Sequence, residues 1–267
     1  MKRITTINEI KENYFSGLNE AQLYHYFEPE EGVFIAESPN VIERALNAGY
    51  EPLELLISES IAEEHKELME KCGEVYIMSK EAEAEVAGFS MTRGALCAMR
   101  RRVLPTLDEI LNGNSRIAVL ENIMNPTNVG AVFRSAAALG MDAVILTKAS
   151  ADPLYRRAAR VSMGTVFQIP WTIVEKLDEK FFQTLKEQSF ATAAMALKED
   201  SVNINNEDLL ANEKLAIILG TESEGLTETT IKHSDYTVCI PMMHGVDSLN
   251  VAAAGAVAFW NVGHINK

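Results

Sequence analysis

The chain has 267 residues, and 47% of them are hydrophobic, which is enough to build one large core or the cores of two ordinary domains. No stretch approaches the roughly 20 uninterrupted apolar residues of a membrane span, and the first residues lack the apolar core of a signal peptide, so we expect a cytoplasmic protein. The net charge of −14 excludes a broadly basic protein that binds nucleic acid through charge alone.

The first 105 residues alternate helical and strand-like patterns. Residues 41–49 carry apolar side chains at helical spacing and end in a glycine. Residues 53–58 and 75–79 are short apolar runs typical of strands, and a charged, helix-favouring run separates them. We therefore predict a small α/β domain over residues 1–105.

Residues 106–115 follow a proline and combine a short helix with an Asn-Gly-Asn-Ser turn, a composition that suits a linker. From residue 116 onward a second alternation of strands and helices begins. Continuous apolar strands alternating with helices indicate a mostly parallel sheet that is covered on both faces. We predict that residues 116–267 form this domain, with strands at 117–120, 143–147, 190–194, 215–219 and 237–240 and helices at 128–139 and 248–262.

Cys72, Cys97 and Cys239 lack any spacing that would hold a metal, and their odd number argues against a disulfide framework. We interpret them as reduced, buried small side chains. The basic groups that could contact phosphate despite the acidic total are Arg100-Arg101-Arg102 and the set Lys148, Arg156, Arg157 and Arg160. Ordinary solvated surface is the alternative interpretation of both groups.

Residues 121–140, ENIMNPTNVGAVFRSAAALG, leave a strand, turn at Asn125-Pro126 and enter a helix with one apolar face. Arg134 lies on the opposite face among small residues. Asn128 lies near the start of the helix, where unpaired backbone N–H groups favour anions. The simpler alternatives are an N-cap role for Asn128 and an ordinary surface position for Arg134.

Residues 216–227, AIILGTESEGLT, form an apolar strand followed by Gly220, Glu222 and Gly225. Glycine at the carboxyl end of a strand lets a ligand approach the backbone, and α/β sheets bind ligands at that edge. The spacing GxExxG is neither a dinucleotide-binding fingerprint nor a P-loop. The segment therefore indicates either a ligand-binding loop or a simple turn.

Residues 239–260, CIPMMHGVDSLNVAAAGAVAFW, contain a helix that is apolar on nearly every face and is therefore expected to be buried on more than one side. Ser248 is its predicted N-cap. Asn250 inside this helix needs a partner, because an unsatisfied buried amide costs roughly 1 to 3 kcal/mol. The alternative is a capped core helix in which Asn250 bonds locally.

Taken together and in this order, NPTNVGAVFRSA, LGTESEGL and IPMMHGVDSLNV resemble the three signature motifs of the SpoU (TrmH-type) family in the SPOUT superfamily of methyltransferases. The resemblance implies an α/β domain with a parallel sheet whose C-terminal segment is threaded as a deep trefoil knot, a topology that proteins otherwise avoid. It also implies an S-adenosyl-L-methionine-dependent RNA 2′-O-ribose methyltransferase that works as a homodimer, in agreement with an apolar final helix.

In the family the cofactor lies in the knot and is held mainly by backbone groups. Transferred to this sequence, the resemblance assigns cofactor binding to Ala194, Met195, Ala196, Gly220, Ile240 and Leu249. It assigns the catalytic positions to Asn128, Arg134, Glu222, Ser248 and Asn250. The reaction needs no metal. We expect Arg134 to hold an RNA phosphate and to orient or activate the ribose 2′-OH, Glu222 to shape the pocket, and the other three to position the nucleotide.

The N-terminal segment FIAESPNVIERALNAGYEPLELLIS also resembles the family's small ribosomal-protein-like substrate-binding domain. The sequence departs from the family at three places. Glu37-Ser38 stands where relatives usually carry Glu-Gly, MTRGALCAM replaces a His-Gln-Gly stretch near residue 93, and Ala252 replaces a serine. The last change removes one hydroxyl near the predicted site.

We expect ribosomal RNA as the substrate in preference to tRNA, because tRNA enzymes of this type often rely on short terminal extensions instead of a separate recognition domain. Two alternatives remain open at this stage. One is a catalytically idle RNA-binding or ribosome-assembly module that retains the fold. The other is a methyltransferase that acts on a small molecule or a protein, which would suit the acidic composition.

Overall fold

The computed structural model describes residues 1–10, 14–15, 20–24, 32–86, 93–221 and 223–264, and these form two compact units. The first unit contains residues 1–103 and 154–168, and the second contains residues 104–153 and 169–267. The segment 154–168 therefore packs with the N-terminal unit although it lies between two strands of the second unit. A division of the chain at a single point does not describe this arrangement.

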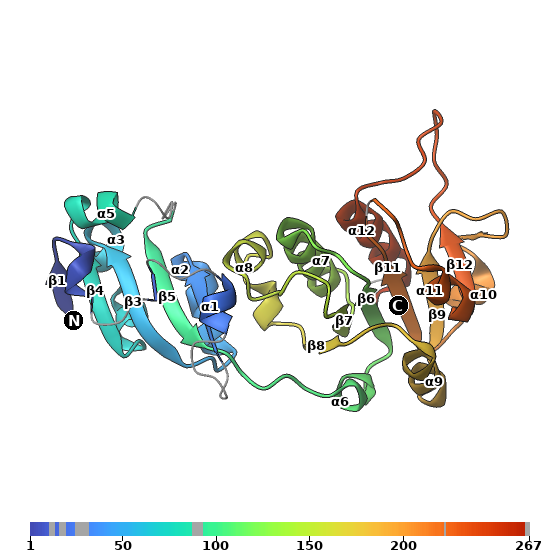
Figure 1. Cartoon of the computed structure of the whole chain (residues 1–267), viewed down its shortest axis with the longest axis horizontal. Coiled ribbons are helices and arrows are strands. Elements are labelled where there is room, and N and C mark those ends of the chain that lie inside the picture. The colour runs from blue at the N-terminus through green and yellow to red at the C-terminus, as the bar shows by residue number, and fades with distance from the viewer. Residues whose placement is uncertain (11–13, 16–19, 25–31, 87–92, 222, 265–267) are drawn as a thin grey trace. The chain divides into compact units, whose positions relative to one another are not determined.

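The first unit is built on a mixed five-stranded sheet in the order β1-β4-β3-β5-β2 (Figure 1). Strands β1, β4 and β3 pair in parallel, and β5 pairs antiparallel with both β3 and β2. The strands are β1 (Lys2–Ile4), β2 (Val33–Glu37), β3 (Pro52–Ser58), β4 (Glu74–Met78) and β5 (Ala95–Arg100). The α-helices are α1 (Glu20–Tyr24), α2 (Pro39–Asn47), α3 (Glu59–Ala62), α4 (Lys66–Glu70), α5 (Lys80–Val86) and α8 (Arg156–Val161).

Helix α8 is attached to this unit by a buried ion-pair cluster. The carboxylate of Glu37 at the end of β2 is fully buried and lies 2.9 Å from Nε of Arg156 and 3.3 Å from an Nη of Arg160. Arg44 on α2 donates a hydrogen bond to the carbonyl of Met163, 2.6 Å away. A buried carboxylate stripped of such partners would be strongly destabilising. These contacts explain why the segment 154–168 belongs to the first unit.

Ser38 occupies a backbone conformation that glycine adopts far more readily. Its φ is 86° and its ψ is 147°, a region that is costly for any residue with a Cβ. Its hydroxyl is buried and has no hydrogen-bond partner among the described residues. This is the position where the resemblance described above implies a glycine.

We predict that Ser38→Gly raises the free energy of unfolding by about 1 to 2 kcal/mol, because it relieves backbone strain and removes an unsatisfied hydroxyl. Chemical denaturation of the variant measures this change. Ser38→Ala removes the hydroxyl but keeps the Cβ, so the difference between the two variants isolates the strain. A glycine variant no more stable than the alanine variant would contradict the assignment of strain.

The second unit is a seven-stranded sheet in the order β10-β12-β9-β11-β6-β7-β8, in which every neighbouring pair is parallel. This confirms the predicted α/β class with a parallel sheet. The strands are β6 (Arg116–Leu120), β7 (Ala143–Thr147), β8 (Trp171–Val174), β9 (Ala191–Met195), β10 (Val202–Asn203), β11 (Leu215–Leu219) and β12 (Tyr236–Cys239). The helices are α6 (Leu107–Leu111), α7 (Pro126–Ala138), α9 (Glu179–Glu187), α10 (Glu207–Leu210), α11 (Glu228–His233) and α12 (Val251–Val262).

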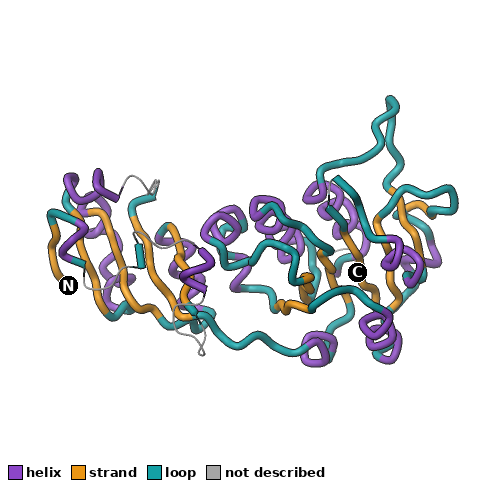
Figure 2. The backbone as a smooth tube through the Cα atoms, in the orientation of Figure 1, coloured by secondary structure: helices purple, strands orange, loops and turns teal. Residues whose placement is uncertain are grey.

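Helices cover both faces of this sheet, as the ribbons around the orange strands in Figure 2 indicate. Side chains from α6, α9 and α11 pack on one face against Ile117, Val119 and Ile218. Helices α7 and α12 pack against each other and against the other face, where Gly255 of α12 meets Leu219. Residues predicted as linker thus contribute to this core, since Ile110 and Leu111 of α6 are buried in it.

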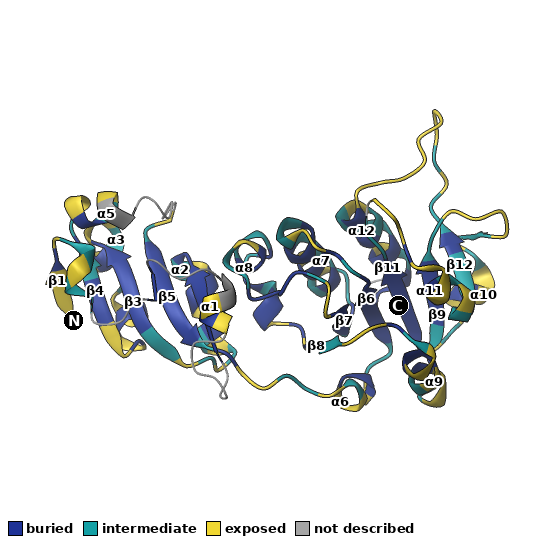
Figure 3. Ribbon diagram, viewed as in Figure 1, coloured by how far each residue is buried: buried dark blue, intermediate teal, exposed yellow. Residues whose placement is uncertain are grey.

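The start of the final helix differs from the prediction. Helix α12 begins at Val251, and its N-cap is Asn250, whose side-chain oxygen accepts a hydrogen bond from the backbone N–H of Ala252 at 3.0 Å. Ser248 lies in the exposed loop before the helix, so the prediction of Ser248 as N-cap was wrong. Serine and asparagine cap helices about equally well, and here it is Asn250 that makes the capping hydrogen bond. Figure 3 shows this loop as exposed beside the buried strands.

Asp142 links strands β6 and β7 at the amino-terminal edge of the sheet. Its carboxylate accepts hydrogen bonds from the backbone N–H groups of Ser115 and Arg116, both at 2.8 Å, and lies 3.1 Å from Nε2 of His264. Burial alone would raise the pKa of Asp142, but these hydrogen-bond donors together lower it below its ordinary value. The carboxylate therefore stabilises the fold in its ionised form.

This lowered pKa predicts a specific pH dependence of stability. Because the folded pKa of Asp142 lies below the unfolded value of about 3.9, its stabilisation is present above that pH and is lost as the pH falls through the folded pKa. We expect Asp142→Asn to cost roughly 1 to 2 kcal/mol at pH 7. Urea unfolding at pH 7 and at pH 3 measures the difference from wild type, which should shrink at pH 3. An undiminished difference at pH 3 would refute this role.

None of the described residues belongs to a helix long and apolar enough to cross a membrane.

Candidate active site

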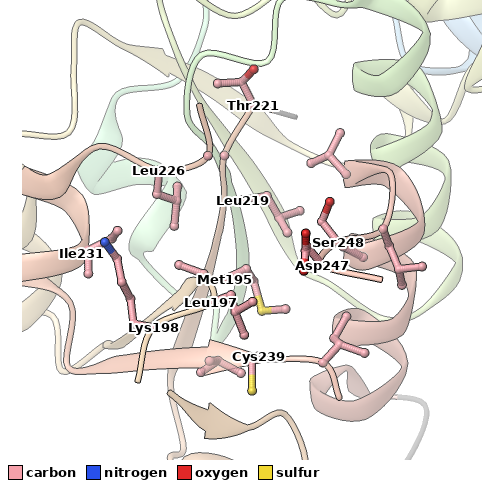
Figure 4. Close-up of a pocket in the computed structure, with 18 of the residues that line it drawn as sticks. Met195, Leu197, Lys198, Leu219, Thr221, Leu226, Ile231, Cys239, Asp247 and Ser248 are labelled. Carbon is pink, nitrogen blue, oxygen red and sulfur yellow. The ribbon is translucent and has the colours of Figure 1, made fainter. Parts of the chain in front are cut away.

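A cavity of about 350 Å³ opens at the carboxyl ends of β9, β11 and β12 in the second unit (Figure 4). Its volume lies in the usual range for a small-molecule site, and its position is the edge where parallel sheets bind ligands. The side chains around it are mainly apolar, including those of Leu219, Leu226 and Ile231. The arrangement suits an organic ligand with a flat apolar part.

Gly220 lets the start of the loop 220–226 touch the backbone at its end, beside this cavity. A Cβ on Gly220 would lie 2.4 Å from the carbonyl carbon of Gly225 and 2.5 Å from the backbone nitrogen of Leu226. The loop 220–226 folds back on itself here, with a β-bridge between Thr221 and Gly225. Only glycine permits this approach, so the sequence of the loop fixes the shape of the cavity wall.

The charged side chains at the cavity are mostly acidic. Glu224, Glu228 and Asp247 line it together with a single described cation, Lys198, whose Nζ lies 2.9 Å from a carboxylate oxygen of Glu228. Nearby carboxylates stabilise positive charge on a bound molecule. The cavity is therefore suited to a ligand that carries a cationic centre.

Most of the residues predicted to bind a cofactor line this cavity. They are Met195, Ala196, Gly220, Ile240 and Leu249. Ala194 does not line the cavity. Its side chain is fully buried in the core that also contains Ile117 and Ile218. The placement brings the second and third sequence motifs to one cavity, while the binding role of each residue stays a prediction.

Asn128 and Asn250 are in direct contact. The side-chain amide nitrogen of Asn250 donates a hydrogen bond to the side-chain oxygen of Asn128 at 3.3 Å. Asn128 is buried inside α7, whose N-cap is Asn125 and not Asn128. Asn250 therefore finds the partner that the sequence analysis required, and it joins the start of α7 to the start of α12.

The other predicted catalytic residues differ in their surroundings. Ser248 lines the cavity two positions before Asn250. Arg134 is exposed on α7, about 9 Å along the helix axis from Asn128, and no hydrogen bond or ion pair joins it to another residue in the described part of the chain. Glu222 lies outside the described residues.

Several cavity residues escaped the sequence analysis, among them Lys198, Glu224, Asp247 and Cys239. Two signals were available for them, since Glu224 lies within the glycine loop and Asp247 precedes Ser248 directly. Lys198 follows strand β9 in a segment without a recognisable pattern. All three cysteines are free, and Cys72 and Cys97 are buried as predicted. Cys239 is only half-buried at the cavity, so the prediction of a buried side chain was wrong for it.

The predicted basic groups are largely engaged within their own units. Arg101 is buried with its guanidinium over the ring of Tyr24, and Arg102 donates to the carbonyl of Ala48. Lys148 pairs with Glu175, 3.0 Å away. Arg157 is exposed on α8. Among the described residues, no group of His, Cys, Asp and Glu side chains is arranged to hold a metal ion.

Comparison with known proteins identifies the class. Residues 115–260, more than half of the chain, match the model of the SpoU rRNA Methylase family. An uncharacterized tRNA/rRNA methyltransferase of Mycobacterium bovis is 37% identical over 85% of this chain and 79% of its own length. The chain therefore belongs to the SpoU rRNA Methylase family, as the three motifs predicted.

Two further relatives span both units. The 23S rRNA (guanosine(2553)-2'-O)-methyltransferase RlmP of Bacillus subtilis is 24% identical over 86% of this chain and 88% of its own length. The crystal structure of the SpoU methyltransferase AviRb from Streptomyces viridochromogenes in complex with AdoMet is 20% identical, covers 93% of this chain and 94% of that chain, and has a TM-score of 0.76. The structural likeness confirms the fold.

Proposed function

We propose that this protein transfers a methyl group from S-adenosyl-L-methionine to a ribose 2′-OH of RNA, with ribosomal RNA preferred over tRNA. One observation carries the proposal: the second and third family motifs line one cavity, and the Asn128–Asn250 contact joins the first motif to the third. Family membership and the names of the relatives support the same activity.

The residues around the cavity fit this cofactor. Leu219, Leu226 and Ile231 offer apolar surface for an adenine ring, and the glycine-closed loop 220–226 presents backbone polar groups at its edge. Glu224 and Asp247 provide negative charge for a sulfonium or an ammonium group. When bound, the cofactor would supply an electrophilic methyl group: a hydroxyl oxygen that attacks the methyl carbon in line forms the new O–C bond, and the S–C bond breaks to release the neutral thioether.

The protein's own residues have to hold the ribose hydroxyl in line with that methyl group. Asn128, Asn250 and Ser248 position the nucleotide, and the hydrogen bond between the two asparagines fixes their orientation. Arg134, exposed and without a partner in the described part of the chain, holds a phosphate of the RNA next to the target ribose. The role in shaping the pocket that the resemblance implies for Glu222 lies outside the described residues.

The hydroxyl proton has to leave during the transfer. A protonated guanidinium has no free electron pair with which to accept a proton, so Arg134 orients and activates the hydroxyl through the substrate phosphate. The phosphate itself can accept the proton. The chain's contribution is therefore mainly placement and charge stabilisation.

The preference for ribosomal RNA comes from the N-terminal unit. We propose that the first unit, which contains the predicted domain 1–105 apart from its last two residues, contacts the RNA substrate. The second unit, which includes the predicted linker 106–115 and most of the predicted domain 116–267, carries the methyltransferase activity. The Bacillus subtilis relative, which is named for a 23S rRNA position, matches 86% of this chain and so extends beyond the methyltransferase part. We also propose a cytoplasmic location, which a ribosomal RNA substrate would suit.

We further propose a trefoil knot and a homodimer. The knot would form if the segment after β12 passes through the loop 220–226, and the common cavity lined by both segments supports this. The dimer would cover apolar side chains that this unit leaves exposed. These include Met243 at 75%, Val246 at 51% and Trp260 of α12 at 57% exposure.

Methyl incorporation tests the proposal. The purified protein is incubated with methyl-labelled cofactor and either total RNA or protein extract from a strain that lacks it. We expect label in RNA as 2′-O-methylnucleoside and more in ribosomal RNA than in tRNA. Label in protein or in a small molecule would show a different substrate class, and cofactor binding without transfer would show an idle RNA-binding module.

A further inference from the structure

Glu121, the residue that follows β6, makes contacts that no sequence motif predicted. It is 4% exposed, and its carboxylate accepts three hydrogen bonds from two threonines. The backbone N–H of Thr227 donates at 2.9 Å, the hydroxyl of Thr227 at 3.0 Å and the hydroxyl of Thr230 at 2.7 Å. A buried carboxylate held by neutral donors in this way fixes their positions closely.

The same residue also holds the other end of the cavity loop. The backbone N–H of Glu121 donates to the carbonyl of Leu219 at 2.8 Å. Leu219 is the last residue before the loop 220–226, and Thr227 is the first residue after it. Glu121, directly after the neighbouring strand β6, therefore bonds to both ends of the loop that forms a wall of the cavity.

We propose that Glu121 is a positioning residue that keeps the loop 220–226 in its cofactor-binding shape before the cofactor arrives. Preorganisation of a binding loop raises affinity, because the loop need not be ordered during binding. The proposal rests on the proposed function, since it assumes that S-adenosyl-L-methionine is the ligand of the cavity. It goes beyond it by assigning part of the affinity to a side chain that does not line the cavity.

The test uses Glu121→Gln in the full-length protein. Glutamine keeps one acceptor oxygen but directs an NH₂ group at donors, so it breaks side-chain contacts with Thr227 or Thr230 at the carboxyl end of the loop and leaves the backbone bond to Leu219 in place. We expect the Kd for S-adenosyl-L-methionine, measured by calorimetry, to rise about 10- to 30-fold. We also expect faster hydrogen exchange of backbone amides in residues 220–227 of the ligand-free protein.

Asp142→Asn is the matched control. Asp142 holds two backbone N–H groups at the opposite end of β6, so its loss lowers stability without touching the cavity loop. We expect its Kd to stay within 2-fold of wild type at a comparable fall in Tm. Thr230→Val, which removes one hydroxyl at nearly constant shape, is expected to raise the Kd about 3- to 5-fold and serves if Glu121→Gln does not fold.

The outcomes separate the two proposals. If wild type binds no S-adenosyl-L-methionine, the proposed function fails. If wild type binds it and the Glu121 and Thr230 variants bind equally well, only the positioning role fails. If Asp142→Asn weakens binding as much as Glu121→Gln, affinity follows global stability, and the positioning role is again refuted.

Discussion

Replacing Arg134 by alanine is expected to lower the rate of RNA methylation about 100- to 1000-fold while leaving the Kd for S-adenosyl-L-methionine within about 3-fold of wild type. Losses of this size, roughly 3 to 4 kcal/mol, are typical when one group that stabilises a transition state is removed. Arg134 is exposed and bonds to none of the described residues, so its removal should change stability by less than about 0.5 kcal/mol. Single-turnover kinetics with saturating cofactor measures the effect on the chemical step.

Lys186→Ala provides the control for Arg134. Lys186 is an exposed cation on α9 of the same unit, and its loss changes the net charge equally. We expect its methylation rate to stay within 2-fold of wild type. A folded Arg134→Ala variant that binds cofactor and methylates at full rate would remove Arg134 from the mechanism. An equal loss in both variants would point to general electrostatics.

Gly220→Ala is expected to weaken cofactor binding at least 100-fold. The added methyl group would lie within 2.6 Å of three backbone atoms of Gly225 and Leu226, and backbone atoms cannot move aside as a flexible side chain can. The loop 220–226 therefore has to shift, and the cavity wall shifts with it. Calorimetric titration with S-adenosyl-L-methionine measures the loss, which corresponds to about 3 kcal/mol of binding free energy.

The control for this variant is Gly73→Ala in the first unit. A Cβ at Gly73 would make only ordinary contacts, 3.7 Å and 3.9 Å from two carbonyl oxygens, and its φ is not positive. Cofactor affinity should be unchanged in this variant. Wild-type affinity in a folded Gly220→Ala protein would mean that the ligand does not depend on this loop.

The parallel sheet of the second unit could be predicted because its central strands are uninterrupted apolar runs. The strands predicted at 143–147 and 215–219 coincide with β7 and β11. Strands β1, β2 and β5 of the first unit were not predicted from the sequence. They pair with strands that are distant in the chain, and local sequence patterns do not show such pairing. The packing of residues 154–168 with the first unit was likewise hidden, because it depends on the long-range Glu37 ion pairs.

The cavity could be predicted only in part. The motif residues Gly220, Ile240 and Leu249 line it, but they were placed there by resemblance and not by any local pattern. Asn250 was singled out correctly as a residue in need of a partner, although it caps the helix and does not lie within it. Glu121 carries no sequence signal, because its role depends on two threonines that the fold brings to it.

The most direct test of whether the cavity binds S-adenosyl-L-methionine is a calorimetric titration of the folded full-length protein with this cofactor. We expect saturable heat with one site per chain and a Kd in the micromolar range, together with the loss of that heat in Gly220→Ala. Absence of any binding heat from a protein whose folding and oligomeric state have been verified would contradict the assignment of the cavity to this cofactor.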